Sequence, residues 1–462
     1  MRIPRLPLLP IALFLMLITS VAVAAWEEII VDDDLLQDLF VEDELTGDAI
    51  RRGFVDEQGI VRFPGCSAPM PVGVSGASEL PAQFSFFVDR GAGPVGEWLS
   101  EDLLIYFAGG GACWDAGTCV GSLLGPAPSY FPAILETAQG LEAASQDLLP
   151  VPGAGGILTR RTDNPFASFA KVYVPYCTGD VHVGSSDTVY EYPPESDTQW
   201  SIRHRGFDNL LVVLKWLQIE QQREKGALGP IDDLTVAGSS AGGYAALFNF
   251  PVIRDALGED HRYSIVVDSA NGVLTNDFLD RAFGPPGGEG VWAAKGNLDP
   301  LVQEIVDREP ADSLWVDVFK AIGHTYRDSR VSQSTSAYDA VQALFLLTMQ
   351  QVADGNYDPS IPPAEAELLA ALLEWSPKAR SAMLETAFSV FNYRRYLGAG
   401  TGHIHLLDPP SDIVEFATTN YFEEDSARNV RYVDWLDDML NNRRQFFRTD
   451  WRNLSCFPRC LE

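Results

Sequence analysis

Four short, largely apolar segments constrain the fold of this chain more than any other feature. They lie at residues 103–108, 171–176, 234–237 and 263–267, and the first stops at three glycines. Short apolar runs of this kind are typical of strands that are buried on both faces of a parallel sheet. Between the second and third segments, residues 205–224 repeat apolar side chains at helical spacing and end before Gly226. The order strand, helix, strand predicts a doubly wound, mostly parallel α/β sheet.

The first 25 residues differ from the rest of the chain. Their only charges are Arg2 and Arg5, an apolar run covers residues 11–18, and Ala22-Val23-Ala24 matches a small-x-small cleavage signal. This pattern predicts a signal peptide and a secreted protein, either extracellular or periplasmic. A single anchor helix is the alternative, but the run is short for a bilayer core of about 30 Å. No second segment of about 20 apolar residues follows, so we expect no stable membrane insertion of the mature protein.

Six cysteines fit an exported chain, because an even count there indicates disulfides. Cys113 with Cys119, and Cys456 with Cys460, would each close a small loop. Cys66 and Cys177 remain as a long-range pair or as free thiols. The spacings do not match those of a paired zinc motif, which makes a zinc site the weaker interpretation.

The charge of the chain bears on its partners and on its domain organisation. A formal charge of -31 repels nucleic acid and anionic membrane surfaces, so we expect no nucleic-acid partner. Residues 26–60 read as an acidic lead-in with little core, and residues 61–462 as one catalytic domain. Segments at about 275–330 and 340–395 have helical periodicity with many charges. We expect these two segments to be insertions, some of which form a cap over the site.

One motif points to nucleophilic catalysis. Gly238-Ser239-Ser240-Ala241-Gly242 matches G-x-S-x-G, follows the apolar segment 234–237 and precedes a predicted helix at 243–248. Strand, sharp turn and helix form the nucleophile elbow of α/β-hydrolases, in which the central serine is exposed. Ser240 is central and Ser239 is not, so Ser240 is the expected nucleophile. A plain Gly-Ser turn that caps a helix is the alternative.

A glycine triplet suggests the second part of such a site. Gly109-Gly110-Gly111 directly follows the segment 103–108. Acyl transfer needs N–H groups aimed at an oxyanion, and glycines let the backbone approach closely. We expect the oxyanion donors to be the N–H groups of Gly110, Gly111 and Ala241.

The base and the acid should follow the nucleophile, because the chain order in this fold is Ser, acid, His. Only His403 and His405 lie beyond residue 324, and His403 is the preferred base. His403 and His405 together with Asp408 would be a metal site in a rival interpretation. For the acid, the residues alone leave Asp268 and Asp339 open, since a carboxylate at either place could orient the imidazole.

Taken together, these motifs resemble those of the pectin acetylesterase and Notum carboxylesterase family. The resemblance runs over roughly residues 62–410, and six segments carry it: Gly109-Gly110-Gly111-Ala112-Cys113-Trp114, Val174-Pro175-Tyr176-Cys177-Thr178-Gly179-Asp180-Val181-His182-Val183-Gly184, Ala237-Gly238-Ser239-Ser240-Ala241-Gly242-Gly243, Val267-Asp268-Ser269, Tyr338-Asp339-Ala340-Val341-Gln342 and Gly400-Thr401-Gly402-His403.

The resemblance implies that Asp339 is the acid and that Asp268 is a structural residue or part of the site wall. It also implies a Cys113–Cys119 disulfide beside the oxyanion loop. Two departures limit it: relatives of the Notum type carry a bulky aromatic residue where this chain has Gly111, and the family has more than six cysteines. The lipid-pocket specificity of Notum is therefore not implied.

The resulting hypothesis is a secreted serine carboxylesterase of α/β-hydrolase type that removes acetyl groups from a polysaccharide such as pectin. Its substrate would be an acylated carbohydrate or another small ester, and its mechanism needs no cofactor and no metal. An esterase or lipid deacylase for another acyl ester, and a non-catalytic binding relative, remain alternatives. Six arginines near the motifs either line a basic groove or pair with surface carboxylates: Arg160, Arg161, Arg203, Arg205, Arg394 and Arg395.

Overall fold

The fold is taken from a computed structural model of the chain. The structure describes residues 26–40, 53–67, 69–71, 83–91, 97–98, 100–126, 128–146, 155–223, 228–407, 422, 424–441 and 451–460. The expected signal peptide, residues 1–25, lies outside the described residues.

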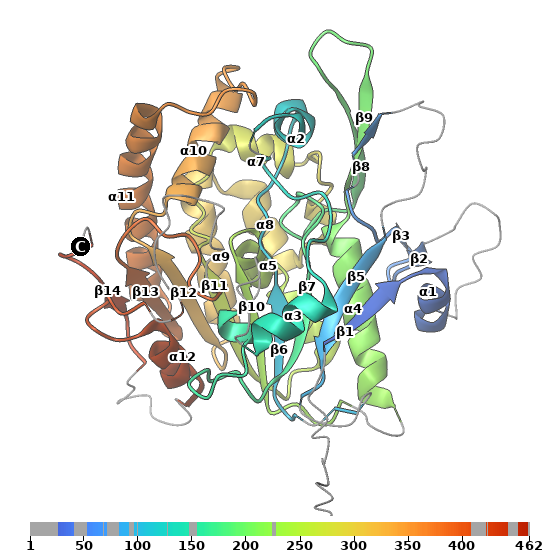
Figure 1. Ribbon diagram of the computed structural model, residues 1–462, viewed down its shortest axis with the longest axis vertical. Helices are drawn as coiled ribbons and strands as arrows, with labels where there is room; N and C mark the ends of the chain where they lie inside the picture. Colours follow the sequence, from blue (N-terminus) through green and yellow to red (C-terminus); the bar gives the residue numbers. More distant parts are fainter. Residues whose placement is uncertain are drawn as a thin grey trace, which may run out of the picture.

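A nine-stranded sheet forms the centre of the molecule (Figure 1). Its strand order is β1-β5-β7-β6-β10-β11-β12-β13-β14. From β7 to β14 all neighbours run parallel, whereas β5 is antiparallel to both β1 and β7. The predicted mostly parallel α/β sheet of α/β-hydrolase type is confirmed. The strands are β1 Glu27–Val31, β5 Phe84–Asp89, β6 Leu103–Phe107, β7 Ala170–Val174, β10 Asp233–Ser239, β11 Arg262–Asp268, β12 Arg330–Ser336, β13 Tyr393–Gly398 and β14 Leu454–Ser455.

The apolar segments of the sequence became the central strands because the sheet is buried on both faces. Every residue of β6, β7 and β10 is buried. The predicted helix at 205–224 is α4, Gly206–Gln222, and it connects β7 to β10 across β6. Helices lie on both sides of the sheet, with α3 in front of the strands and α5 behind them in Figure 1. Other helices of the described chain are α2 Ser122–Leu124, α3 Ala138–Ser145, α5 Ala241–Phe248, α6 Phe250–Leu257 and α12 Tyr432–Asn441.

The two predicted insertions are helical. The first contains α7 Asn276–Ala282, α8 Pro300–Arg308 and α9 Ala311–Thr325, and the second contains α10 Ala340–Ala353 and α11 Glu365–Ser389. The pair α10 and α11 stands beside β12 and β13 and rises past their ends (Figure 1). Short turns of other helix types occur at Gly117–Gly121, Gly156–Leu158 and Lys295–Asn297.

Small accessory sheets flank the main one. The long β8–β9 hairpin, Ser186–Glu191 and Gln199–His204, projects from the body of the molecule in Figure 1 and pairs with β4, Met70–Pro71. The short strands β2, Phe54–Val55, and β3, Val61–Arg62, pair with each other.

The acidic segment at residues 26–60 differs from its prediction. It was expected to contribute little core, but β1 is an outer strand of the main sheet and pairs with β5 over five residues. The following helix α1, Asp33–Leu39, buries Leu36 and Leu39. Its three consecutive aspartates cap and begin this helix, where carboxylates are favourable, so they do not indicate an unpacked arm. Residues 41–52 lie outside the described part.

Three disulfides stabilise loops around the sheet. They join Cys66 to Cys177, Cys113 to Cys119 and Cys456 to Cys460, and the structure contains no free cysteine among its described residues. The long-range alternative for Cys66 and Cys177 is therefore the one that holds. Within the described residues, none of the helices has the length and apolarity that crossing a membrane requires.

Candidate active site

Ser240 lies in a strained turn between β10 and α5. Its φ of 56° is in the left-handed region, which a non-glycine residue rarely adopts. The flanking glycines make the turn possible: a Cβ at Gly238 would lie 2.1 Å from the Gly242 carbonyl oxygen, and one at Gly242 would lie 2.0 Å from that of Phe107. The predicted strand, turn and helix are thus present, and the turn projects Ser240 from the end of the sheet.

The Ser240 side chain lies at a narrow pocket with a volume of about 70 Å³. On a comparable measure one water molecule needs about 10–15 Å³. Apolar side chains from three parts of the fold line most of the pocket. The oxyanion loop contributes Trp114, α5 contributes Phe248, and the insertion helices contribute Phe278, Phe345, Met349 and Trp375. Residues from both predicted insertions therefore line this pocket, and their role as a cap stays a prediction.

His403 lines the same pocket as Ser240 and is held by Asp339. The Nδ1 atom of His403 lies 2.9 Å from each carboxylate oxygen of Asp339. The Nε2 atom of His403 has no hydrogen-bond partner within the described chain. An imidazole held at Nδ1 by a carboxylate, with Nε2 directed elsewhere, has the arrangement of a general base.

Asp339 is rigidly positioned. It caps the N-terminus of α10, where its Oδ1 accepts the N–H groups of Val341 and Gln342 at 3.1 and 3.0 Å. The side-chain amide of Gln342 donates to Oδ2 at 2.8 Å. The carboxylate is fully buried, so these donors and His403 replace the water it lacks. The sequence motif around Asp339 is thus a helix start that fixes the carboxylate.

The other candidate pair, Asp268 and His405, is also formed, but away from the pocket. Asp268 ends β11, and its Oδ1 lies 3.3 Å from His405 Nδ1. Both side chains are fully buried, and neither lines the Ser240 pocket. Burial raises the pKa of Asp268, but hydrogen bonds from His405, Leu406 and Ser334 outweigh it and hold this pKa below its usual value. Burial lowers the pKa of His405, yet its contact with Asp268 leaves that pKa raised overall.

The three predicted oxyanion donors lie close to Ser240. Gly111 and Ala241 line its pocket, and a Cβ at Gly109 would lie 3.0 Å from the Ser240 Cβ. The N–H groups of Gly110, Gly111 and Ala241 donate to no backbone oxygen in the described chain. Gly111 has a φ of 81°, and a Cβ there would lie 2.0 Å from the Ser129 carbonyl oxygen. Only glycine therefore fits this backbone without movement of the loop.

Sequence reasoning assigned no role to the side chains that support this glycine loop. His182 Nε2 lies 3.0 Å from the carbonyl oxygen of Ala108, the residue before the triplet. Burial lowers the pKa of His182 to about 4, so the ring is neutral and can donate there. Asp180 accepts the N–H groups of His182, Gly184 and Gly206. The clustering of Asp180 and His182 in one short motif was the signal available in the sequence.

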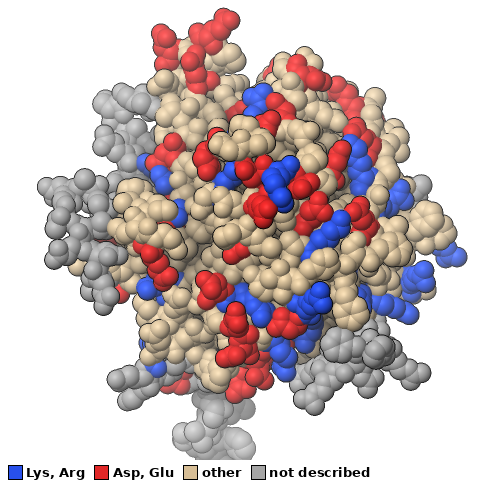
Figure 2. Space-filling view, turned by 180° about the vertical axis from the view of Figure 1, so that it is seen from behind, with Lys and Arg blue, Asp and Glu red and all other residues tan. Residues whose placement is uncertain are grey.

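Four of the six arginines pair with carboxylates, as the surface-pairing alternative expects. The Ser240 pocket has no arginine in its lining. Arg160 pairs with Asp89 and Glu142, and Arg205 pairs with Asp187 and Asp208. Arg161 and Arg203 also contact carboxylates, while Arg394 stacks over Trp451, and Arg395 lies on β13. Basic and acidic side chains are largely intermixed on the face seen in Figure 2.

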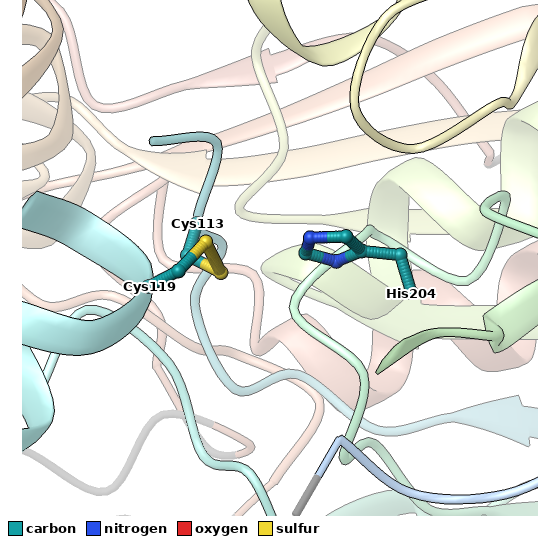
Figure 3. A group of neighbouring side chains, drawn as sticks. All are labelled: Cys113, Cys119 and His204. Carbon is teal, nitrogen blue, oxygen red and sulfur yellow. A yellow bond between two sulfur atoms is a disulfide. The ribbon is translucent and has the colours of Figure 1, made fainter. Parts of the chain in front are cut away.

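A possible metal cluster elsewhere does not have the chemistry of a metal site. In the described chain, Cys113, Cys119 and His204 bring potential ligand atoms together (Figure 3). The two sulfurs are bonded to each other, so neither is a thiolate. Both ring nitrogens of His204 have partners, the Thr178 carbonyl at 2.9 Å and the Tyr190 hydroxyl at 3.1 Å. In the rival site near His403, Asp408 lies outside the described residues.

Comparisons with known proteins agree with the motifs. Residues 83–277 match the family model described as pectinacetylesterase, which confirms the resemblance. None of the curated proteins matches the chain. A solved structure, described as the Wnt deacylase Notum from Drosophila, has a TM-score of 0.48 and 17% sequence identity, and the match covers 79% of this chain and 90% of that chain. The family match ends before Asp339 and His403. The link between these two residues and Ser240 therefore rests on their contacts and on the shared pocket in the structure.

Proposed function

Because residues 83–277 match the pectinacetylesterase family, we propose that this chain is a secreted serine carboxylesterase with Ser240, His403 and Asp339 as its catalytic residues. The family match supports an acyl esterase in general. The observation that carries the finer proposal is His403, which Asp339 holds at Nδ1 and which shares a pocket with Ser240. These residues follow β10, β12 and β13 in the order Ser, Asp, His.

In the first step, the Ser240 hydroxyl oxygen attacks the ester carbonyl carbon while His403 Nε2 takes the hydroxyl proton. The carbonyl oxygen becomes an oxyanion, which the N–H groups of Gly110, Gly111 and Ala241 stabilise by hydrogen bonds. Asp339 stabilises the imidazolium without taking its proton. His403 then gives the proton to the leaving alcohol oxygen, and the acyl group stays on Ser240.

In the second step, water replaces the alcohol. His403 takes a proton from the water molecule as the water oxygen attacks the acyl carbon. The resulting oxyanion uses the same N–H donors. Collapse of this intermediate returns the proton from His403 to Ser240 Oγ and releases a carboxylic acid, so the free enzyme is regenerated.

The substrate that fits best is an acetyl ester of a polysaccharide such as pectin. The family match points to this class, and a pocket of about 70 Å³ accepts a short acyl group. A second candidate is the hydrolysis of a longer acyl ester. The apolar lining favours it, because Phe278, Phe345, Met349 and Trp375 would gain contacts with additional methylene groups.

The test is hydrolysis of p-nitrophenyl acetate, butyrate and octanoate by the mature protein and by Ser240→Ala. Ser313→Ala, on α9 and outside the pocket, is the matched serine control. Loss of Ser240 should lower kcat on the order of 10⁶-fold, as expected for a member of a catalytic triad. Equal activity of the wild type and Ser240→Ala would refute the nucleophile assignment. A preference for acetate would support the deacetylase, and a preference for octanoate the second candidate.

A further inference from the structure

Asp268 is a buried carboxylate to which the proposed mechanism gives no role. It accepts hydrogen bonds from three separate segments of the site. The nucleophile elbow contributes the Ser239 hydroxyl at 3.1 Å, and β12 contributes the Ser334 hydroxyl at 2.8 Å. The base loop contributes the N–H groups of His405 and Leu406 at 2.8 and 3.0 Å. A carboxylate with this many donors is a fixed point that connects the segments.

We propose that Asp268, paired with His405, is a positioning residue that sets the distance between Ser240 and His403. This inference rests on the proposed function, because it assigns Asp268 a role through those two residues. Asp268 contacts neither the pocket nor the reacting atoms, so it is not a catalytic residue.

The connection to the nucleophile is direct. The Asp268 carbonyl oxygen accepts the N–H of Ser240 at 2.9 Å, and its carboxylate accepts the hydroxyl of the preceding residue, Ser239. The same residue thus contacts the elbow through both main chain and side chain. Because Ser240 is held at a φ of 56°, such contacts are needed to keep the strained turn in place.

The connection to the base is equally short. His405 lies two residues after His403, and its main chain and ring both contact Asp268. The next residue, Leu406, also donates its N–H to the Asp268 carboxylate. The loop that carries His403 is therefore anchored at residues 405–406 to the end of β11. Rotation or shift of Asp268 would move the base relative to the nucleophile.

The charge of the pair supports this role. Asp268 accepts hydroxyl and N–H groups at both oxygens and donates none, as an ionised carboxylate does. His405 Nδ1 lies 3.3 Å from the same carboxylate, and a buried carboxylate needs such a partner. Conversion of Asp268 to a neutral amide would place NH₂ donors against donors of the elbow or the base loop.

The test compares Asp268→Asn with Asp208→Asn. Asp208 is a matched control because it is as buried as Asp268. It accepts hydrogen bonds from the Phe63 N–H, the Ser185 hydroxyl and the Arg205 guanidinium, and none of these groups belongs to the site. Four quantities are measured: the rate constant for labelling Ser240 with a fluorophosphonate, kcat per labelled site, KM, and the melting temperature. The labelling rate constant and the kinetic constants report on the alignment of folded molecules, and the melting temperature reports on stability.

For Asp268→Asn we expect kcat and the labelling rate to fall on the order of 10²-fold with little change in KM, as for a misplacement of about 1 Å. Asp208→Asn should melt at a lower temperature while kcat per labelled site stays within about two-fold. If Asp268→Asn does not fold, Ser239→Ala removes the side-chain contact of Asp268 to the elbow, together with the hydrogen bond that Tyr106 donates to Ser239, and should lower kcat on the order of ten-fold. Tyr106→Phe removes the Tyr106 hydrogen bond alone and is the control for it.

An unchanged kcat per labelled site in folded Asp268→Asn, or in Ser239→Ala where Asp268→Asn does not fold, overturns the inference. An equal loss of kcat in Asp208→Asn also overturns it, because the effect would then be general destabilisation. A wild type that is not labelled at Ser240 refutes the proposed function itself, and the inference falls with it.

Discussion

Two aspartate–histidine pairs occupy neighbouring positions in this protein, and they differ in their surroundings. The His403 and His405 rings lie two residues apart on one loop, and each places Nδ1 within 3.3 Å of a buried carboxylate. The side chain of His403 is 14% exposed at the pocket, whereas that of His405 is fully buried. A histidine with a carboxylate partner is therefore not by itself a catalytic base. Contact with the substrate pocket makes the difference.

The contrast between the carboxylates is as instructive. Asp339 accepts N–H groups of α10 at Oδ1 and the Gln342 side-chain amide at Oδ2, and both oxygens lie 2.9 Å from His403 Nδ1. Asp268 divides its contacts among the elbow, β12 and the base loop. In the first pair, Asp339 holds the imidazole ring of His403. In the second pair, Asp268 connects three segments of the chain. The experiments below compare the two pairs directly.

Replacement of the two histidines should give the largest difference. His403→Ala should lower kcat on the order of 10⁶-fold, because without the base the triad loses most of its effect. His405→Ala should lower kcat by no more than on the order of 10²-fold, since it affects only alignment. Steady-state kinetics on p-nitrophenyl acetate measure both values.

The same two variants should show the opposite order in stability. Loss of His405 leaves Asp268 buried without its partner, which costs about 3–5 kcal/mol in comparable cases. Thermal unfolding should therefore show a lower melting temperature for His405→Ala than for His403→Ala. Equal loss of activity in the two variants would contradict the distinction between the pairs.

Asp339→Asn should have the next largest effect. An amide can donate to Nδ1 and stabilise the wrong tautomer of His403, and the corresponding change in a known triad lowers kcat about 10⁴-fold. This loss should exceed that of Asp268→Asn by on the order of 10²-fold. Kinetics of both variants on the same ester measure the ratio. A larger loss in Asp268→Asn would exchange the roles of the two carboxylates.

The smallest effect concerns stability and pH. The pKa of Asp268 is lower in the folded protein than in the unfolded chain, where it is about 3.9. Its contribution to the free energy of unfolding is therefore present above about pH 3.9, and it is lost as the pH falls through the folded pKa. The folded pKa of His405 is raised, so its contribution is full below about 6.5 and is lost as the pH rises through the folded value. The pair thus stabilises the fold most between these two limits.

Melting temperatures of the wild type and of the double variant Asp268→Asn/His405→Gln, measured across pH, test this window. The double variant removes both titrations. The difference in melting temperature between it and the wild type should therefore change least between the two pH limits and most outside them. The variant His403→Gln serves as a control that leaves Asp268 and His405 in place. A constant difference at every pH would show that the buried pair does not titrate during unfolding.

The sequence predicted the sheet and the strand–turn–helix around Ser240 because both depend on local patterns. The apolar runs of β6, β7 and β10 can be recognised from their own residues. Gly238 and Gly242 stand where strand and helix approach closely around Ser240, and a side chain at either position would not fit. The helical insertions were predictable for the same reason, since α10 and α11 have their own periodicity.

Other features were not predictable because they depend on contacts distant in sequence. His403 lines the pocket, whereas His405 contacts Asp268, which is 137 residues away from it in the sequence. The sequence left open whether the arginines line a groove or pair with carboxylates, because some of their partners are distant in sequence, as Asp89 is for Arg160. The acidic residues near Asp33 made β1 and α1 hard to predict from sequence. The pairing of β1 depends on β5, which is distant in sequence.

The connection between β13 and the loop at Cys456–Cys460 has a consequence for the timing of synthesis. The N–H of Gly400, three residues before His403, donates to the Cys460 carbonyl oxygen, and β14 pairs with β13. A ribosome makes residue 460 after every residue of the proposed triad. A growing chain that already carries Ser240, Asp339 and His403 still lacks this support for its base loop. Full activity therefore has to wait until residues 454–460 have been made and have docked against β13.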